Sequence, residues 1–208
     1  LAIYTTQILA ANALGVTVSA AHRIAATLFS FTVLCGDPLV QAGQAFMPEH
    51  IINPVKANAR KMAMILFQFG LFTAAVCSSG FAAFCFLGAS VFTTDAAVIA
   101  QLQSVVLPMS ATVVANILSK SLYGVMVAAR ALNFLAGLTG LGLLGFAAAM
   151  LYLDRHVVGL AKYSYIWWIT FAYYGLASLI LFCRINGIVF KSILRDDAED
   201  DDAKAASA

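Results

Sequence analysis

Long stretches of mainly apolar residues follow one another along this chain, with short polar segments between them. An α-helix needs about 20 consecutive apolar residues to cross the hydrocarbon core of a bilayer, and it satisfies its backbone hydrogen bonds internally. The pattern therefore predicts an all-α, polytopic membrane protein. We expect six transmembrane helices, at about 1–17, 19–48, 62–87, 98–128, 131–153 and 163–184.

The connections between these helices are expected to be short. A tight link is predicted at 18–23, a polar connection at 49–61, a turn at 90–97 and a polar loop at 154–162. Asp95 is well placed to cap the helix after its turn. Since the chain opens within apolar sequence and without Met, we expect the first helix to be truncated.

One carboxylate, Asp37, lies inside a predicted span. It shares a helix face, at helical spacing, with Thr27, Ser30, Gln41 and Gln44. An acid in hydrocarbon costs at least about 2.5–3.5 kcal/mol, so it should face protein or a watery cavity. Pro38 follows and is expected to bend the helix there. This pattern indicates a functional acid, although an Asp that only joins two helices by a hydrogen bond would produce it as well.

A second polar stripe follows a predicted kink at Pro108 in the fourth span, and it consists of Thr112, Asn116, Lys120 and Tyr123. Lys120 precedes the surface residue Arg130 by about as many residues as Asp37 precedes Pro48. If both helices run towards the same surface, the two charges lie at matching depth. An ion pair between Asp37 and Lys120 would lower the insertion cost of each. The alternative is that Lys120 extends towards the membrane surface and never meets the acid.

Composition supports the membrane prediction. The chain is 62% hydrophobic and 11% charged, against about 45–50% and about 25% in soluble domains. A formal net charge of +2 is too small to indicate a nucleic-acid partner. Six of the ten acidic residues lie at 196–202. We therefore expect a transmembrane lobe at 1–187, followed by an acidic, disordered, cytoplasmic tail at 188–208.

Basic residues predict the orientation of this integral, multi-pass protein. Alternate loops place seven of them on one side, namely Lys56, Arg60, Lys61, Arg130, Arg184, Lys191 and Arg195. The other side carries Arg23, Arg155 and Lys162. The positive-inside rule then makes the connection at 49–61 and the C-terminus cytoplasmic.

Side chains that could bind a metal or a cofactor are scattered. The cysteines stand singly in apolar helices, without a CxxC pair or a nearby His cluster, at Cys35, Cys77, Cys85 and Cys183. They are typical of packing thiols, and His22 is typical of an interfacial hydrogen-bonding residue. There is no HExxH motif, no nucleophile–base spacing and no pair of facing carboxylates in the spans. We expect no enzyme activity, no metal site and no cofactor.

Several of these segments resemble the MATE (multidrug and toxic compound extrusion) transporters. The sequence Ser-Ala-Ala-His-Arg-Ile at 19–24, Gly-Asp at 36–37 and Gln-Ala-Gly-Gln-Ala at 41–45 resemble the seventh-to-eighth helix region of the plant and algal DETOXIFICATION-like branch. Segment 91–95 resembles the turn before its tenth helix, and segments 123–124 and 128–134 resemble the end of that helix. The resemblance spans about 1–184.

This resemblance implies one C-terminal lobe of a twelve-helix, two-lobe antiporter. Such transporters export organic compounds, whether drugs, metabolites or organic acids, in exchange for protons or sodium. The partners implied are a small organic substrate, the bilayer and an N-terminal lobe of the same protein. The first, second and fourth spans would line the central cavity, which makes the candidate substrate- or ion-binding residues Asp37, Gln41, Gln44, Asn116, Lys120 and Tyr123.

One position departs from the pattern of the family. Many relatives carry an acid just before a glycine in the tenth helix, whereas Tyr123 precedes Gly124 here. Asp37 would then be the one carboxylate of this lobe able to couple a cation. Two other functions stay open, a non-transporting scaffold or degenerate paralogue and a flippase for lipid-linked substrates. The plasma, vacuolar and plastid membranes all stay possible locations.

Overall fold

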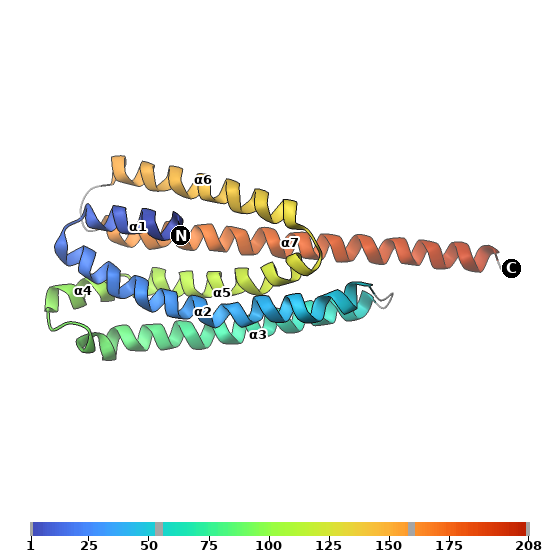
Figure 1. Ribbon diagram of the computed structural model, residues 1–208, viewed down its shortest axis with the longest axis horizontal. Helices are drawn as coiled ribbons and strands as arrows, with labels where there is room; N and C mark the ends of the chain where they lie inside the picture. The colour runs from blue at the N-terminus through green and yellow to red at the C-terminus, as the bar shows by residue number, and fades with distance from the viewer. Residues whose placement is uncertain (1, 53–55, 158–160, 207–208) are drawn as a thin grey trace.

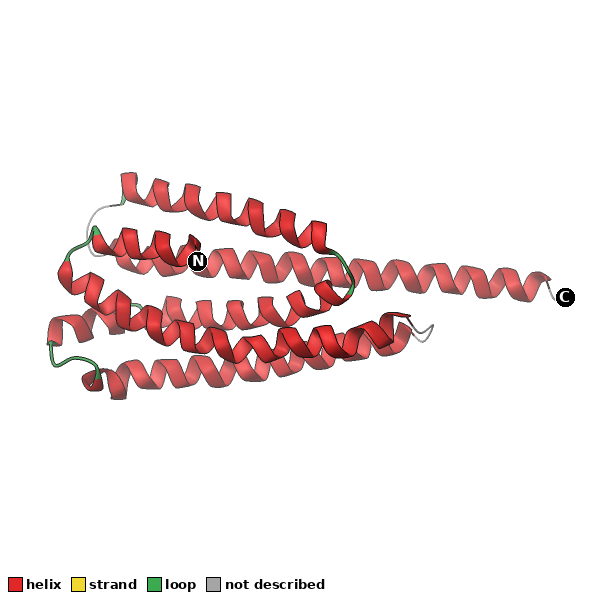
Figure 2. Ribbon diagram, in the orientation of Figure 1, coloured by secondary structure: helices red, strands yellow, loops and turns green. Residues whose placement is uncertain are grey.

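The computed structural model describes residues 2–52, 56–157 and 161–206 (Figure 1). The helices are α1 (Ala2–Asn12), α2 (Val16–Ile52), α3 (Lys56–Ala83), α4 (Ala96–Ser104), α5 (Val106–Ala128), α6 (Leu132–His156) and α7 (Ala161–Ala206). A π-helical turn at Phe84–Gly88 and a 3-10 turn at Ala89–Val91 extend α3. Figure 2 shows helices and loops, and no strand in the described part of the chain. The all-α fold is confirmed.

Five helices of the described residues are long and apolar enough to cross a membrane, namely α2, α3 with its π turn, α5, α6 and α7. The segment predicted as the first span forms α1, of 11 residues. At 1.5 Å per residue this helix is about 16 Å long, roughly half the thickness of the hydrocarbon core. The structure therefore supports a multi-pass membrane protein, and the predicted count of six spans is approximate.

The first connection differs from the prediction. The turn lies after Asn12 and not at 18–23, because Gly15 adopts φ +104°, a conformation that glycine reaches without steric cost. Ser19 donates a hydrogen bond to Asn12 Oδ1 at 2.5 Å across this turn. His22 and Arg23 consequently lie within α2. The tight link predicted at 18–23 was wrong.

The fourth predicted span is two helices, α4 and α5, and not one kinked helix. The break falls at Val105, whose φ and ψ are −108° and 7°. Pro108 has no N–H to bond the Ser104 carbonyl four residues earlier, and it is tolerated in the first turn of α5. The predicted cap is confirmed, since Asp95 accepts a hydrogen bond from the Ala97 N–H at 2.8 Å. Within α2, by contrast, the helix continues through Pro38 and Pro48, and a bend at Pro38 stays a prediction.

α5 is the central helix, and it packs against α2, α3 and α7. Its contact with α2 is made by backbone at two glycines. A Cβ on Gly43 would lie 2.8 Å from the carbonyl carbon of Gly124, and a Cβ on Gly124 would lie 2.7 Å from the Val40 oxygen. Small residues of this kind let membrane helices approach closely. The contact brings the backbones of α2 and α5 close together just beyond Asp37.

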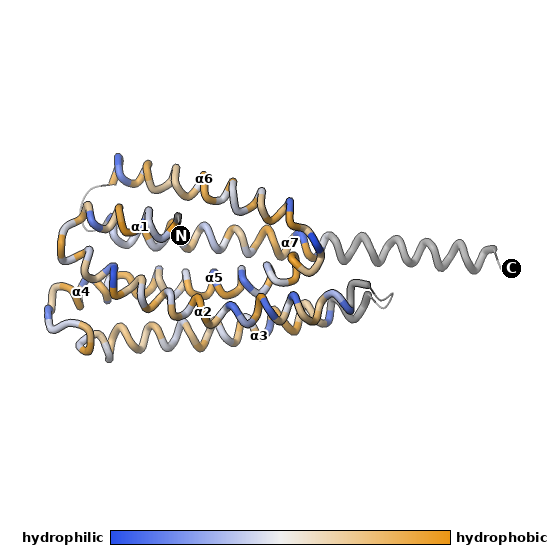
Figure 3. The backbone as a smooth tube through the Cα atoms, viewed as in Figure 1, coloured by the Kyte–Doolittle hydropathy of each residue, from blue (hydrophilic) through white to orange (hydrophobic). Residues whose placement is uncertain are grey.

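α6 lies at one edge of the bundle and α3 at the other (Figure 1). In the apolar stretch of α6 that could cross a membrane, only 17% is buried inside the protein, against 56% in the corresponding stretch of α5. Apolar residues make up most of the helices of the bundle (Figure 3), and large exposed side chains include Phe31, Phe72, Leu144 and Leu176. Such a surface fits contact with lipid.

α7 is drawn as one helix to Ala206, so it includes the acidic segment that we expected to be disordered. The side chains after Gly187 lie outside the described part of the structure. The division of the chain at 187, and the disorder of 188–208, stay predictions.

Candidate functional site

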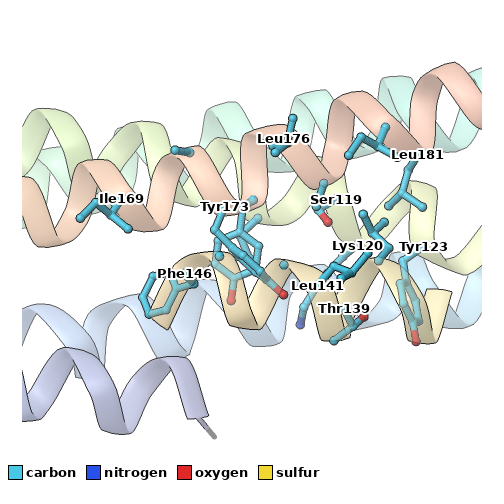
Figure 4. Close-up of a pocket in the computed structure, with 18 of the residues that line it drawn as sticks. Ser119, Lys120, Tyr123, Thr139, Leu141, Phe146, Ile169, Tyr173, Leu176 and Leu181 are labelled. Carbon is cyan, nitrogen blue, oxygen red and sulfur yellow. The ribbon is translucent and has the colours of Figure 1, made fainter. Parts of the chain in front are cut away.

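A groove of about 880 Å³ is lined by side chains of α2, α5, α6 and α7 (Figure 4). Its lining is mainly apolar and aromatic, with a few polar side chains, a composition typical of small-molecule sites. The polar and aromatic residues that line it are Asp37, Asn116, Ser119, Lys120, Tyr123, Thr139, Phe146, Tyr173 and Tyr174. These residues belong to the stretches of α2, α5, α6 and α7 that are long and apolar enough to cross a membrane.

Asp37 and Lys120 form an ion pair at this groove. Lys120 Nζ donates hydrogen bonds to Asp37 Oδ1 and, at 2.8 Å, to the Val33 carbonyl. The side chain of Lys120 is 21% exposed and that of Asp37 is 46% exposed. The predicted pair is confirmed, since Lys120 does meet the acid. Lys120 thus balances the negative charge of Asp37, and the Asp37 side chain stays accessible from the groove.

Gly36 makes room for this pair. A Cβ at Gly36 would lie 2.8 Å from Lys120 Cδ and 3.7 Å from Ile117 Cγ1. The lysine stem therefore passes directly over the α2 backbone before it reaches the carboxylate one residue further on. The Gly-Asp sequence at 36–37 places a space for the stem next to an acceptor for its charge.

Asn116 supplies a buried acceptor next to the pair. Its side chain is 3% exposed, and its Oδ1 has no hydrogen-bond partner among the described residues. Buried polar atoms usually have a partner, so an unpaired acceptor in the wall of a groove is available to a bound molecule. Tyr123, one turn beyond Lys120, is 38% exposed and also lines the groove.

Gln41 and Gln44 do not line the groove. Both are exposed on the outer face of α2, as are Thr27 and Ser30. The two hydroxyls donate to the carbonyls of their own helix, Thr27 to Arg23 at 2.9 Å and Ser30 to Ala26 at 2.8 Å. The structure thus brings together Asp37, Asn116, Lys120 and Tyr123 and leaves the two glutamines outside.

Thr112, the first member of the second stripe, turns away from the groove. Its hydroxyl lies between the Pro108 carbonyl at 2.7 Å and the Trp167 carbonyl at 3.1 Å, and its side chain is fully buried. It joins α5 to α7. Within this stripe, the structure separates one packing residue from the three that line the groove.

The walls supplied by α6 and α7 were not predicted from the sequence. Gly142 of α6 accommodates the ring of Tyr173, since a Cβ there would lie 2.9 Å from Tyr173 Cε2. Tyr173 and Tyr174 contact each other at a centroid distance of 4.9 Å, and Tyr173 contacts Phe146 at 5.9 Å. Figure 4 shows Tyr173, Lys120 and Tyr123 in the space between α7 and α6. The adjacent tyrosines in the middle of the sixth span were the available signal.

Among the described residues, no three His, Cys, Asp or Glu side chains gather in a way that could hold a metal ion. Two of the cysteines are not as isolated as the sequence indicated, because the side chains of Cys35 on α2 and Cys77 on α3 contact each other. Both are free thiols.

Comparison with known proteins adds one relationship. The chain is 26% identical over 162 residues to Protein DETOXIFICATION 47, chloroplastic, of Arabidopsis thaliana. This similarity suggests a MATE-like family. The match covers 77% of this chain, which spans 30% of the length of that relative. No family profile and no solved structure matches the chain.

The similarity and the apolar helices together support a multi-pass membrane protein of the transporter type. They agree with the family that the segments at 19–24 and 36–45 resemble. Which lobe the chain forms, and to which branch it belongs, are part of the proposal below.

Proposed function

We propose that this chain is the C-terminal lobe of a secondary active antiporter of the MATE type, in the plant and algal DETOXIFICATION-like branch. The complete protein would export organic compounds in exchange for protons or sodium. The observation that carries the proposal is the Asp37–Lys120 pair in a groove lined by apolar and aromatic residues. Ionisable residues inside membrane helices are rare and mark substrate and ion pathways.

The outer face of α2 supports a second lobe as partner. Thr27, Ser30, Gln41 and Gln44 are exposed there, within a helix long and apolar enough to span the membrane. Amide side chains in contact with hydrocarbon would lose their hydrogen bonds to water. A water-filled cavity between this lobe and an N-terminal lobe of the same protein would satisfy them. In this arrangement Gln41 and Gln44 face the cavity, and the groove opens from it.

Asp37 is the proposed coupling acid. When it is ionised, it holds Lys120. When a proton or a sodium ion neutralises it, the attraction is lost and Lys120 keeps the Val33 carbonyl as its partner. Binding of the ion and breakage of the pair are therefore linked, and a shift of α2 against α5 could follow because both charges lie at that contact.

Substrate would bind in the same groove. Its aromatic and apolar walls fit the hydrophobic body of an organic compound, and Asn116 Oδ1 can accept a hydrogen bond from it. Tyr123 and Lys120 offer donors. Exchange requires that ion and substrate are not bound together, and a shared position next to Asp37 would provide this.

The test uses the full-length protein in proteoliposomes with an imposed proton or sodium gradient. Asp37→Asn keeps the shape of the side chain and removes its charge, and we expect it to abolish gradient-driven efflux. Glu49→Gln, near the end of α2 and outside the groove, is the matched control and should transport normally. Normal efflux by Asp37→Asn would remove Asp37 from the coupling mechanism.

The same assay separates transport from a scaffold role. In a scaffold, neither the wild-type protein nor any variant would move substrate.

A cytoplasmic C-terminus stays part of the proposal. Labelling of a cysteine introduced near Ala208, from either side of sealed vesicles, tests it. The name of the relative makes a plastid membrane one candidate, beside the plasma and vacuolar membranes.

A further inference from the structure

A second polar site lies at the packing of α2 on α7, near the beginning of both helices. His22 of α2 is 1% exposed, and Tyr163 and Trp167 of α7 are fully buried. The His22 ring lies 6.0 Å from the Tyr163 ring and 5.6 Å from the Trp167 ring, centroid to centroid. None of the three lines the groove that contains Asp37. The mechanism proposed above does not use them.

By geometry, four buried polar atoms of these side chains make no hydrogen bond within the described part of the chain, namely Nδ1 and Nε2 of His22, the hydroxyl of Tyr163 and Nε1 of Trp167. The Tyr163 hydroxyl lies near the Trp167 side chain without the geometry of a hydrogen bond. Buried polar groups in folded proteins are nearly always hydrogen-bonded to protein or to ordered water. Four unpaired atoms in one place therefore indicate a bound molecule that both donates and accepts.

The donors and acceptors among the four atoms indicate which kind of molecule can bind. A neutral imidazole offers one donor and one acceptor, a phenol offers both, and an indole N–H only donates. An anion would need a cation, and the buried Lys162 next to Tyr163 is already paired with Asp154 at 2.5 Å. A metal ion cannot bind to the Trp167 N–H. Water makes two to four hydrogen bonds in buried sites and matches this mixture.

We propose that His22, Tyr163 and Trp167 form an internal water site, in which at least one water bridges α2 to α7. The surroundings confine it, since the neighbouring core consists of apolar and thiol side chains, among them Ala25, Phe29 and Cys85. The path to bulk water is short, because the spans of α2 and α7 begin at Val16 and Lys162, close to His22 and Tyr163. Two helices that form the groove are thus joined at this end by an exchangeable molecule.

The first experiment is hydroxyl-radical labelling by X-ray radiolysis of the full-length protein in nanodiscs, in ¹⁸O water, read by mass spectrometry. Radicals formed from a bound water label the side chains beside it even when these are buried. We expect Tyr163 and Trp167 to be labelled several-fold more than Phe81, a buried aromatic ring without a polar atom that does not line the groove. Labelling of all three at the same low level would overturn the proposal.

A second experiment measures the sign of a stability change. Tyr163→Phe removes one hydroxyl. In a hydrated site the water loses a partner, so the melting temperature should fall. The direct contact of Tyr163 with Trp167 is lost as well, so the labelling of Trp167 decides whether the two side chains share a water. Tyr152→Phe, at an exposed position on α6, is the control. We also expect Tyr163→Phe to reduce the labelling of Trp167. A rise in melting temperature together with unchanged Trp167 labelling would contradict a shared water. Neither experiment depends on transport, so failure here leaves the proposed function untouched.

Discussion

Lys120 of α5 reaches Asp37 of α2 by passing over the backbone of Gly36. The ion pair and the helix contact are therefore one structural unit. Any change that displaces the lysine stem should alter both the packing of α2 on α5 and the charge in the groove. Substitutions that change only the charge, or only the space for the stem, separate the effect of charge from that of packing.

Lys120→Met should destabilise the protein, because it leaves a partly buried carboxylate without its cation. Breaking a fully buried pair costs about 3–5 kcal/mol, and the cost here should be smaller because the Asp37 side chain is 46% exposed. Asp37→Asn combined with Lys120→Met should recover part of the loss. Thermal unfolding of the two single variants and the double variant gives the coupling. Additive effects would mean that the two side chains do not interact in the membrane.

Gly36→Ala should weaken the pair without changing any charge. The added Cβ would lie 2.8 Å from Lys120 Cδ, so the stem must move, at a cost of about 1–3 kcal/mol. Gly137→Ala is the matched control, because nothing lies within 4 Å of a Cβ there. Alanine at that position should stabilise α6 by about 0.5–1 kcal/mol. We would measure the melting temperatures of both variants and the efflux by Gly36→Ala. Equal melting temperatures for Gly36→Ala and Gly137→Ala would argue against close packing at Gly36.

Gly124→Val should be the most damaging of the glycine substitutions. Its Cβ would meet backbone atoms of Val40 at 2.7–3.2 Å, and backbone cannot rotate away as a side chain can. We expect a loss of at least about 3 kcal/mol, or a protein that does not fold. The loss of folding is measured by expression level and gel-filtration profile. The control is Gly140→Val, on the open face of α6. Normal folding would show that α2 and α5 are further apart than described.

Cys35 and Cys77 offer a test of the packing of α2 on α3. Their side chains are in contact, so a short thiol-to-thiol cross-linker should join them in the membrane. A trypsin cut in the connection at 49–61, which contains Lys56, Arg60 and Lys61, would then leave the two fragments linked on a denaturing gel. Cys35→Ser is the control. Separate fragments from the cross-linked wild-type protein would contradict the contact.

The sequence predicted this site in part, and the reason lies in helical periodicity. Spacing placed Asp37 and Lys120 at equal depth, and the structure pairs them. Periodicity states which residues share a face but not what that face meets. Gln41 and Gln44 share a stripe with Asp37, yet only Asp37 lies at the boundary with α5, where it turns into the groove. The walls from α6 and α7 were missed because they depend on tertiary packing, as at Gly142 and Tyr173.

Local chemistry predicted the helix boundaries unevenly. Asp95 was identified as a cap because capping is a local interaction with the following N–H groups. The turn at Gly15 was misplaced, since the apolar sequence on both sides of it hides the break. At Pro108 a kink was predicted, whereas the helix breaks at Val105, and α4 packs separately against α2.

Asn116 provides the sharpest test of which predicted residues contact the substrate. Asn116→Leu preserves size and removes the unpaired Oδ1 acceptor from the groove wall. If substrate donates a hydrogen bond to it, losing about 1.4 kcal/mol of binding raises the KM for efflux about tenfold. Stability should change little, because removal of the unpaired Oδ1 offsets loss of the interaction between the Asn116 amide and Tyr174. Gln44→Leu, on the outer face of α2, is the control and should change KM far less, since Gln44 does not line the groove. The opposite order, with Gln44→Leu impaired and Asn116→Leu normal, would move the substrate from the groove to the outer face of α2.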